Sequence, residues 1–212
     1  MSLPASPSLQ DIETQFDLQQ IDRDSLFLVE LDEIPELTDE EKQRLERARS
    51  QYLNLRGQSA IATLVGWVLL SPLLDLAGFY ALPLDFSARN SIALAEGDEE
   101  APSGRIDLLV VGERLWIAVV ESQWASATPQ EALPAVLQGM MAEEQRDRVR
   151  FGLITNGRES LFVRLNRAES PQYALSQTYS LSGLGFEFYE VLRNLKAIAR
   201  VLFGLGNDAI GD

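Results

Sequence analysis

The stretch of sequence that decides the fold runs from Gly104 to Gln123 and reads GRIDLLVVGERLWIAVVESQ. Residues 106–111 and 115–120 are short apolar runs rich in β-branched side chains, and Gly112-Glu113-Arg114 separates them. This pattern is typical of two strands joined by a tight hairpin. We therefore expect the two runs to be adjacent antiparallel strands.

Three polar residues lie at the open end of this predicted hairpin. Asp107 stands near the start of the first strand, and Glu121 and Gln123 stand at the end of the second. Side chains alternate along a strand, so Glu121 and Gln123 project from one face while Ser122 points away. Because the hairpin brings Asp107 and Glu121 together, the two carboxylates suit a hard cation such as Mg²⁺. The simpler alternative is that Asp107 ends a strand edge and Glu121 is a solvated strand end.

The hairpin and the segments that follow it resemble the PD-(D/E)XK nuclease superfamily. The resemblance is to the nuclease domain at the N-terminus of type I restriction enzyme R subunits and to their stand-alone relatives. In that family a Gly-Arg-x-Asp strand precedes a strand ending in Glu-x-Lys, then a helix with a glutamine, then a strand ending in Thr-Asn-Gly. This chain has the pieces in the same order, within residues 57–165: Gly104-Arg105-Ile106-Asp107, Glu121-Ser122-Gln123, Gln138 and Thr155-Asn156-Gly157.

The resemblance implies a fold and a site. The fold is an α/β (α+β) restriction-endonuclease-like core, in which helices flank a small mixed β-sheet. The site holds Mg²⁺, or Mn²⁺, through Asp107, Glu121 and the carbonyl of Ser122, while Gln123 orients the attacking water and Gln138 is accessory. The sequence departs from the family twice.

Gln123 stands where the family has its lysine. The family also has a glutamate in the first turn of an earlier helix, and the nearest match here is Gln58, because residues 49–74 contain no acid. The missing lysine removes a cation and a general base from the expected catalytic set, and the missing glutamate removes a third acidic ligand.

Length and composition exclude several classes of site. With 212 residues the chain is long enough for one full core, which we assign to residues 37–212, with residues 1–36 as an acidic N-terminal extension. The chain has no cysteine and no histidine, which excludes disulfides, thiolate metal sites and histidine catalysis. Its start lacks the basic and apolar regions of a signal peptide, so we expect a cytoplasmic protein.

The charge distribution gives conflicting indications about nucleic-acid binding. A formal net charge of −14 disfavours a simple nucleic-acid binder. Residues 146–167 are nevertheless rich in arginine, and such a segment can line a groove for phosphates. Alternatively, these arginines only solvate the end of a helix. The arginines are Arg146, Arg148, Arg150, Arg158, Arg164 and Arg167.

The longest uncharged apolar run, residues 60–74, raises the question of a membrane span. It is shorter than the ~20 residues that a span needs, and it contains Gly66 and Pro72. We therefore expect a buried core helix with a proline kink, and no membrane association.

Local signals predict the remaining elements. Thr38 with Glu41 is a capping box, so a helix is expected from there to about residue 55. Thr128 followed by Pro129 predicts the start of a second helix, and Asn156-Gly157 predicts a second hairpin. We expect strands at residues 25–31, 86–94, 151–155 and 161–165, a C-terminal helix at residues 181–203, and a frayed end at residues 1–10.

Three functional hypotheses follow. The first is a metal-dependent nuclease that cleaves DNA. The second is a nuclease fold that has lost catalysis and binds nucleic acid or a protein. The third is a restriction-system subunit, which assembles with a helicase or methyltransferase component or as a homo-oligomer. An exposed aromatic patch at Trp116 or Trp124 would support the third.

Overall fold

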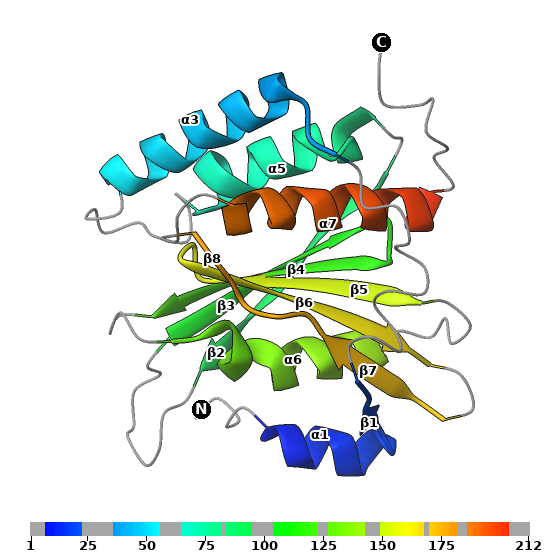
Figure 1. Ribbon diagram of the computed structural model, residues 1–212. Coiled ribbons are helices and arrows are strands. Elements are labelled where there is room, and N and C mark those ends of the chain that lie inside the picture. The colour runs from blue at the N-terminus through cyan, green and yellow to red at the C-terminus, as the bar shows by residue number, and fades with distance from the viewer. Residues whose placement is uncertain are drawn as a thin grey trace.

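A mixed eight-stranded sheet lies between two layers of helices in the computed structural model (Figure 1). The structure describes residues 7–22, 36–55, 65–81, 84–94, 104–122, 127–142, 149–167, 170–181 and 186–203. The expected α/β class, a mixed sheet flanked by helices, is confirmed. The α-helices are α1 (Leu9–Phe16), α3 (Asp39–Leu55), α5 (Ser71–Leu76), α6 (Pro129–Ala142) and α7 (Phe186–Phe203), with a π-helical turn η1 (Val65–Leu70) and a 3-10 turn η2 (Phe79–Ala81). The strands are β1 (Gln19–Gln20), β2 (Phe86–Leu94), β3 (Gly104–Val111), β4 (Leu115–Ser122), β5 (Arg150–Thr155), β6 (Glu159–Asn166), β7 (Gln172–Leu175) and β8 (Tyr179–Ser180).

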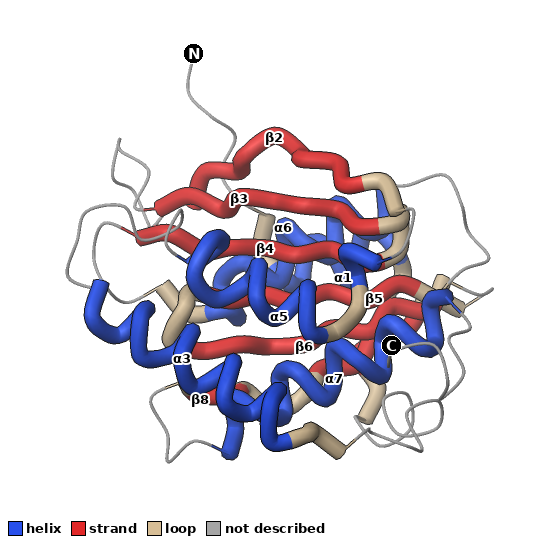
Figure 2. The backbone as a smooth tube through the Cα atoms, turned by 90° about the horizontal axis from the view of Figure 1, so that it is seen from above, coloured by secondary structure: helices blue, strands red, loops and turns tan. Residues whose placement is uncertain are grey.

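The strands are arranged in the order β1-β7-β6-β5-β4-β3-β2, and β8 pairs with β6. Strands β2, β3 and β4 form an antiparallel meander, and β5, β6 and β7 form a second one. The two meanders join through the parallel pair β4 and β5, which the crossover helix α6 connects. Figure 2 shows β2 to β6 side by side, with α3, α5 and α7 in front of the sheet. This arrangement puts β4 and β5 at the centre of the sheet.

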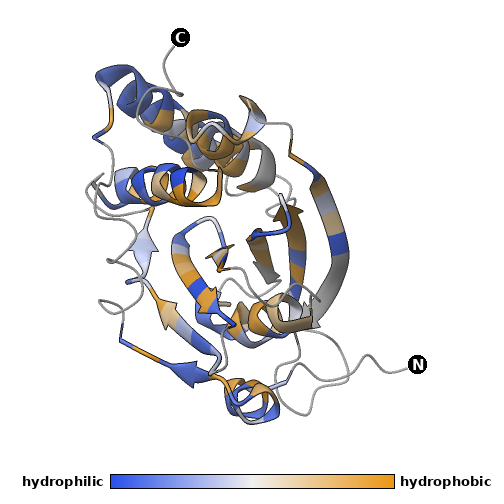
Figure 3. Ribbon diagram, turned by 90° about the vertical axis from the view of Figure 1, so that its right-hand side faces the viewer, coloured by the Kyte–Doolittle hydropathy of each residue, from blue (hydrophilic) through white to orange (hydrophobic). Residues whose placement is uncertain are grey.

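Each face of the sheet has its own hydrophobic core. Alternate residues of β4 belong to different cores. Ile117 and Val119 face α3, η1, α5 and α7. Ala118 and Val120 face α6 and α1. Because both faces are covered, β4 and β5 are almost continuously apolar, as buried strands are. The apolar sides of the helices face the sheet in Figure 3.

The predicted turns and caps are present. The backbone N–H of Thr38 donates to Glu41 Oε2 at 2.8 Å, and the N–H of Glu41 donates to Thr38 Oγ1 at 3.2 Å, so the capping box opens α3 as predicted. In the β3–β4 turn Gly112 and Glu113 have φ values of 56° and 59°. Positive φ values suit a tight hairpin, because their local twist matches that of the flanking strands.

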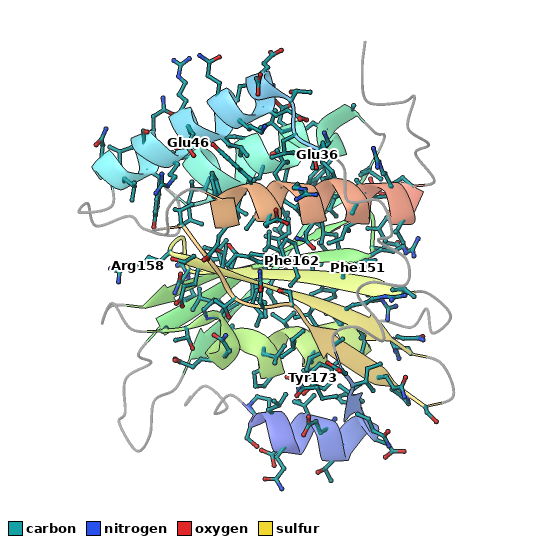
Figure 4. The ribbon with its side chains drawn as sticks, viewed as in Figure 1. Glu36, Glu46, Phe151, Arg158, Phe162 and Tyr173 are labelled. Atoms are coloured by element: carbon teal, nitrogen blue, oxygen red, sulfur yellow. The ribbon has the colours of Figure 1, made fainter. Side chains whose placement is uncertain are left out.

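The first described segment is part of the sheet structure. Helix α1 packs against α6 and buries Ile12 completely, and β1 pairs in parallel with β7. Tyr173 extends from β7 toward α1 (Figure 4), and its hydroxyl donates to Glu13 Oε1 at 2.7 Å. Burial, and then this contact with Glu13, raises the pKa of the Tyr173 phenol far above its ordinary value. Residues 9–22 of the expected extension, including residues 9–10 that we expected to be frayed, therefore pack onto the fold.

Several elements differ from the expected ones. The C-terminal helix begins at Phe186, not at Leu181, which is a turn residue. The described part of the apolar run 60–74 is the expected buried helical segment, but its first part, η1, is π-helical. It passes directly into α5, because Leu70 keeps a right-handed helical backbone, and Pro72 follows just after the π-helical turn. Strands β1, β7 and β8 and helix α1 were not predicted. The strand expected at residues 25–31 lies outside the described residues.

None of the helices in the described ranges is long and apolar enough to cross a membrane.

Candidate metal centre

The register of the β3–β4 hairpin places Asp107 and Glu121 on the same face of the sheet. Asp107 pairs with Val119, and Arg105 pairs with Glu121. Residues directly opposite each other in an antiparallel pair share a face, and so do residues two apart on one strand. Asp107 and Glu121 are therefore diagonal neighbours, with Cα atoms about 7–8 Å apart in such an arrangement. That spacing lets an aspartate and a glutamate reach one cation.

Asp107 is held by an arginine on its own strand. Arg105 Nη2 donates to Asp107 Oδ2 at 2.8 Å. The Arg105 side chain is 52% exposed and that of Asp107 is 37% exposed, so solvent reaches both. Arg105 also stands directly opposite Glu121 in the register. The backbone positions of Arg105, Asp107 and Glu121 therefore lie together at the open end of the hairpin.

The other predicted ligands are described only in part. The structure gives the backbone of Glu121 and Ser122 as the end of β4, and their side chains are not among the described parts. The separation of the Asp107 and Glu121 carboxylates therefore stays a prediction. Gln123 and Gln58 lie outside the described residues.

Gln138 lies away from this cluster. It is half-buried on α6, and α6 packs against the face of β4 that carries Ala118 and Val120. Asp107 and Glu121 belong to the other face, with Val119. The structure therefore does not bring the predicted accessory glutamine together with the two acids.

A row of paired residues continues from Asp107 across the sheet. Val119 pairs with Asp107 on one side and with Thr155 on the other, and Thr155 pairs with Ser160. The buried Thr155 hydroxyl donates to the Glu159 carbonyl at 2.8 Å and accepts the Gly157 N–H at 3.1 Å. Thr155 thus fixes the turn that follows β5, one strand away from the acids.

The Asn156 side chain connects this turn to the segment after β4. Asn156 Oδ1 accepts the backbone N–H groups of Arg158 at 2.9 Å and Glu159 at 2.8 Å. Asn156 Nδ2 donates to the carbonyl of Ala127 at 2.9 Å. Ala127 comes four residues after Gln123 in the sequence. The Thr-Asn-Gly turn therefore anchors the chain just beyond the candidate Glu-x-Gln motif.

The prediction that the arginines of residues 146–167 line a groove is wrong for two of them. Arg150 is buried, and its Nη1 donates to the Met140 carbonyl near the end of α6 at 3.0 Å. Arg164 is buried with its guanidinium 5.9 Å from the centroid of the Phe151 ring. Both arginines stabilise packing, since an arginine inside a fold bonds to carbonyls and stacks on rings. Arg158 is exposed and points outward beside the turn (Figure 4).

Trp116 does not provide the exposed aromatic patch that would support the third hypothesis. Trp116 is only 3% exposed, and its ring lies against Gly139 of α6. Trp124 lies outside the described residues. The large exposed hydrophobic side chains among the described residues are Tyr80 and Phe86, whose ring centroids are 5.7 Å apart.

No group of three or more acidic side chains that could hold a metal occurs within the described ranges. The candidate centre therefore depends on the two acids of the hairpin and on backbone carbonyl oxygen. That donor set is all oxygen, which suits Mg²⁺ or Mn²⁺ and not a soft metal.

Arg105 is the site residue to which sequence reasoning gave no role. The signal was present, because Arg105 stands two residues before Asp107 and side chains at that spacing share a face of a strand. What the sequence could not provide was the contact itself, since a long arginine side chain has many conformations and several carboxylates within reach.

Comparison with known proteins identifies no relative: no protein-family model matches the chain, and no curated protein or solved structure matches it significantly.

Proposed function

We propose that this protein is a Mg²⁺-dependent nuclease that hydrolyses phosphodiester bonds in DNA, on a restriction-endonuclease-like core and in the cytoplasm. The observation that carries the proposal is the register of β3 and β4, which puts Asp107 and Glu121 on one face at the open end of the hairpin. The order of the elements adds support. The Asp strand β3, the Glu strand β4, the helix α6 and the strand β5 with its Thr-Asn-Gly turn follow one another as the resemblance implies.

In this proposal Asp107, Glu121 and the carbonyl of Ser122 hold the metal. Asp107 and Leu109 lie on the face of β3 that also carries Arg105, and both are only partly buried. A hydrated ion therefore has access to this face. A carboxylate offers about four lone-pair positions, and the bond from Arg105 to Oδ2 uses one of them. The donor set therefore fits a hard divalent cation.

The bound metal would lower the pKa of a water molecule and neutralise charge on the phosphate. The amide of Gln123 orients the attacking water, because it offers both a donor and an acceptor. It cannot take up the proton or supply the positive charge of a lysine. The chemistry of the site therefore depends on the carboxylates and on any cation nearby.

Calorimetry tests the metal site directly. Titrating Mg²⁺ or Mn²⁺ into the protein is expected to show one binding event, and Glu121→Ala is expected to weaken it about 10-fold or more, because one of two charged ligands is lost. Asp85→Ala is the matched control, since Asp85 is an exposed acid next to the turn at the opposite end of the hairpin. Equal metal affinity of wild type and Glu121→Ala would place any metal elsewhere.

The glutamine at position 123 leads to a prediction about the rate. A lysine there places a cation near the phosphate, where a preorganised charge stabilises the transition state. Gln123→Lys is expected to raise Mg²⁺-dependent cleavage of plasmid DNA about 10-fold or more, equivalent to ~1.4 kcal/mol. Combining it with Asp107→Ala is expected to abolish the gain. Fast wild-type cleavage that survives Asp107→Ala would mean that the chemistry lies elsewhere in the chain.

A second candidate function is a catalytically inactive nuclease fold that binds nucleic acid or assembles as a subunit of a restriction system or as a homo-oligomer. The observation in its favour is that Arg105 already pairs with Asp107, as in a structural ion pair. On this reading wild type and Gln123→Lys are equally inactive. Binding of labelled DNA, or the mass in sedimentation, is then unchanged by EDTA and by Asp107→Ala. Loss of DNA binding in EDTA would favour the nuclease.

A further inference from the structure

We propose that Arg105 acts both as a stand-in for the metal and as the phosphate-binding cation of the site. Without metal its guanidinium neutralises Asp107, and Arg105 stands opposite Glu121 in the register. With metal bound, the carboxylates hold the metal and the guanidinium contacts the scissile phosphate. This inference rests on the proposed nuclease activity. It assigns to Arg105 the positive charge that Gln123 does not supply.

The position of Arg105 carries the first half of the inference. The residue donates to Asp107 Oδ2 at 2.8 Å and stands directly opposite Glu121 in the β3–β4 register. Two carboxylates that share a face repel each other, and a cation between them relieves that repulsion. An arginine and a divalent metal therefore compete for the same pair of acids.

The exposure of the pair makes the exchange inexpensive. The Arg105 side chain is 52% exposed, and ion pairs at such exposure stabilise by no more than about a fivefold factor in an equilibrium constant. A metal with two carboxylate ligands outweighs that factor. Arg105 can therefore leave Asp107 without disturbing the core below, because Ile106 and Leu108 anchor β3 from the other face.

The chemistry of the guanidinium carries the second half. It is planar and permanently charged, and its donors match two phosphate oxygens at once. It projects from the same face as both acids, where a metal-bound phosphate would lie. Arg114, the second arginine of the hairpin, lies in its turn and donates to the carbonyls of Val149 and Leu202. Among the described residues near the acids, Arg105 is the arginine that shares their face of the sheet.

The first test is a metal titration by calorimetry on Arg105→Gln. Removing the competing cation is expected to tighten Mn²⁺ binding about fivefold. Arg89→Gln is the matched control: Arg89 pairs with Leu108 on the neighbouring strand β2, and its guanidinium lies over Trp116 on the opposite face. That variant is expected to bind Mn²⁺ like the wild type. Arg105→Lys keeps the charge and is expected to stay within about twofold of the wild type.

The second test measures the affinity for a short fluorescein-labelled DNA duplex by anisotropy, with Ca²⁺ as the metal probe. Arg105→Gln is expected to weaken binding about 10-fold and to reduce the slope of log affinity against log salt by about one, as the loss of one phosphate contact requires. Arg89→Gln and Arg105→Lys are expected to keep the wild-type slope.

The outcomes separate this inference from the proposed function. Metal binding that is equal in wild type and Arg105→Gln overturns the inference and leaves the nuclease proposal intact, and so does an unchanged salt slope. Arg105→Lys behaving like Arg105→Gln overturns it as well, because the effect would then not come from charge. A wild type that binds no Mn²⁺ overturns the proposed function and this inference with it.

Discussion

Gly157→Ala is expected to lower the free energy of unfolding by about 2–5 kcal/mol, as measured by urea denaturation. Gly157 has a φ of 80°, and a left-handed backbone costs a residue with a side chain about 1–2 kcal/mol. An added Cβ would also overlap the hydroxyl of Tyr52 and the side chain of Val65. Overpacking of that kind costs about 1–3 kcal/mol more.

The matched control is Gly152→Ala, because Gly152 lies within the strand β5 that leads into this turn. A Cβ at Gly152 would meet Val163 at 3.4 Å and Val136 at 3.5 Å, which is ordinary contact, so this variant is expected to keep the stability within about 1 kcal/mol. Gly157→Ala combined with Tyr52→Phe should recover part of the loss. If Gly157→Ala is as stable as Gly152→Ala, the close approach of α3 and η1 to this turn is not real.

Glu41→Ala is expected to destabilise the fold by about 3–5 kcal/mol. Glu41 Oε1 accepts a hydrogen bond from Lys196 Nζ of α7 at 2.5 Å, while Oε2 caps α3 through the Thr38 N–H. The Lys196 side chain is 9% exposed, so removal of its partner would leave a buried ammonium unpaired. The loss of that pairing outweighs the loss of the cap, which contributes about 1 kcal/mol.

Two variants check this interpretation in thermal or urea unfolding. Glu40→Ala removes an exposed acid from the same turn of α3 and is expected to change the stability by less than about 0.5 kcal/mol. Glu41→Ala with Lys196→Met removes the unpaired charge and should recover most of the loss. A double variant no more stable than Glu41→Ala would show that the cap, and not the ion pair, holds α3 in place.

Local signals predicted most of the fold. The Thr38 capping box, the break at Gly112 and the Asn156-Gly157 turn each specify a conformation through neighbouring residues, so the elements around them were predicted closely. The start of α7 was placed too early, although Gly183 and Gly185 disfavour a helix before Phe186.

The elements that were missed are short and depend on partners distant in the sequence. Strands β7 and β8 have four and two residues, too few for alternation to be recognised. Helix α1 carried its own signal, because Ser8 and Asp11 form a capping box and Leu9, Ile12 and Phe16 recur at helical spacing. The proline and serine residues before it led us to expect a frayed end there instead.

The site was predictable as far as strand alternation reaches. The hairpin pattern predicted that Asp107 and Glu121 converge, in agreement with the register, which puts both on one face. It could not show that α6, and Gln138 with it, covers the opposite face, since the side of a sheet that a crossover helix takes is a property of the whole fold. The burial of Arg150 and Arg164 was equally unpredictable, because arginine is rarely buried without partners from distant segments.

The hydrogen bond from Tyr173 to Glu13 fixes the order in which the molecule can be completed. The two residues are 160 positions apart, so at about 5–20 residues per second the ribosome finishes β7 about 10–30 s after it has released α1. A helix of eight residues is too short to persist alone in water. The segment of α1 and β1 therefore completes its contacts only after β7 has been made, and until then Ile12 and Leu18 are available to chaperones.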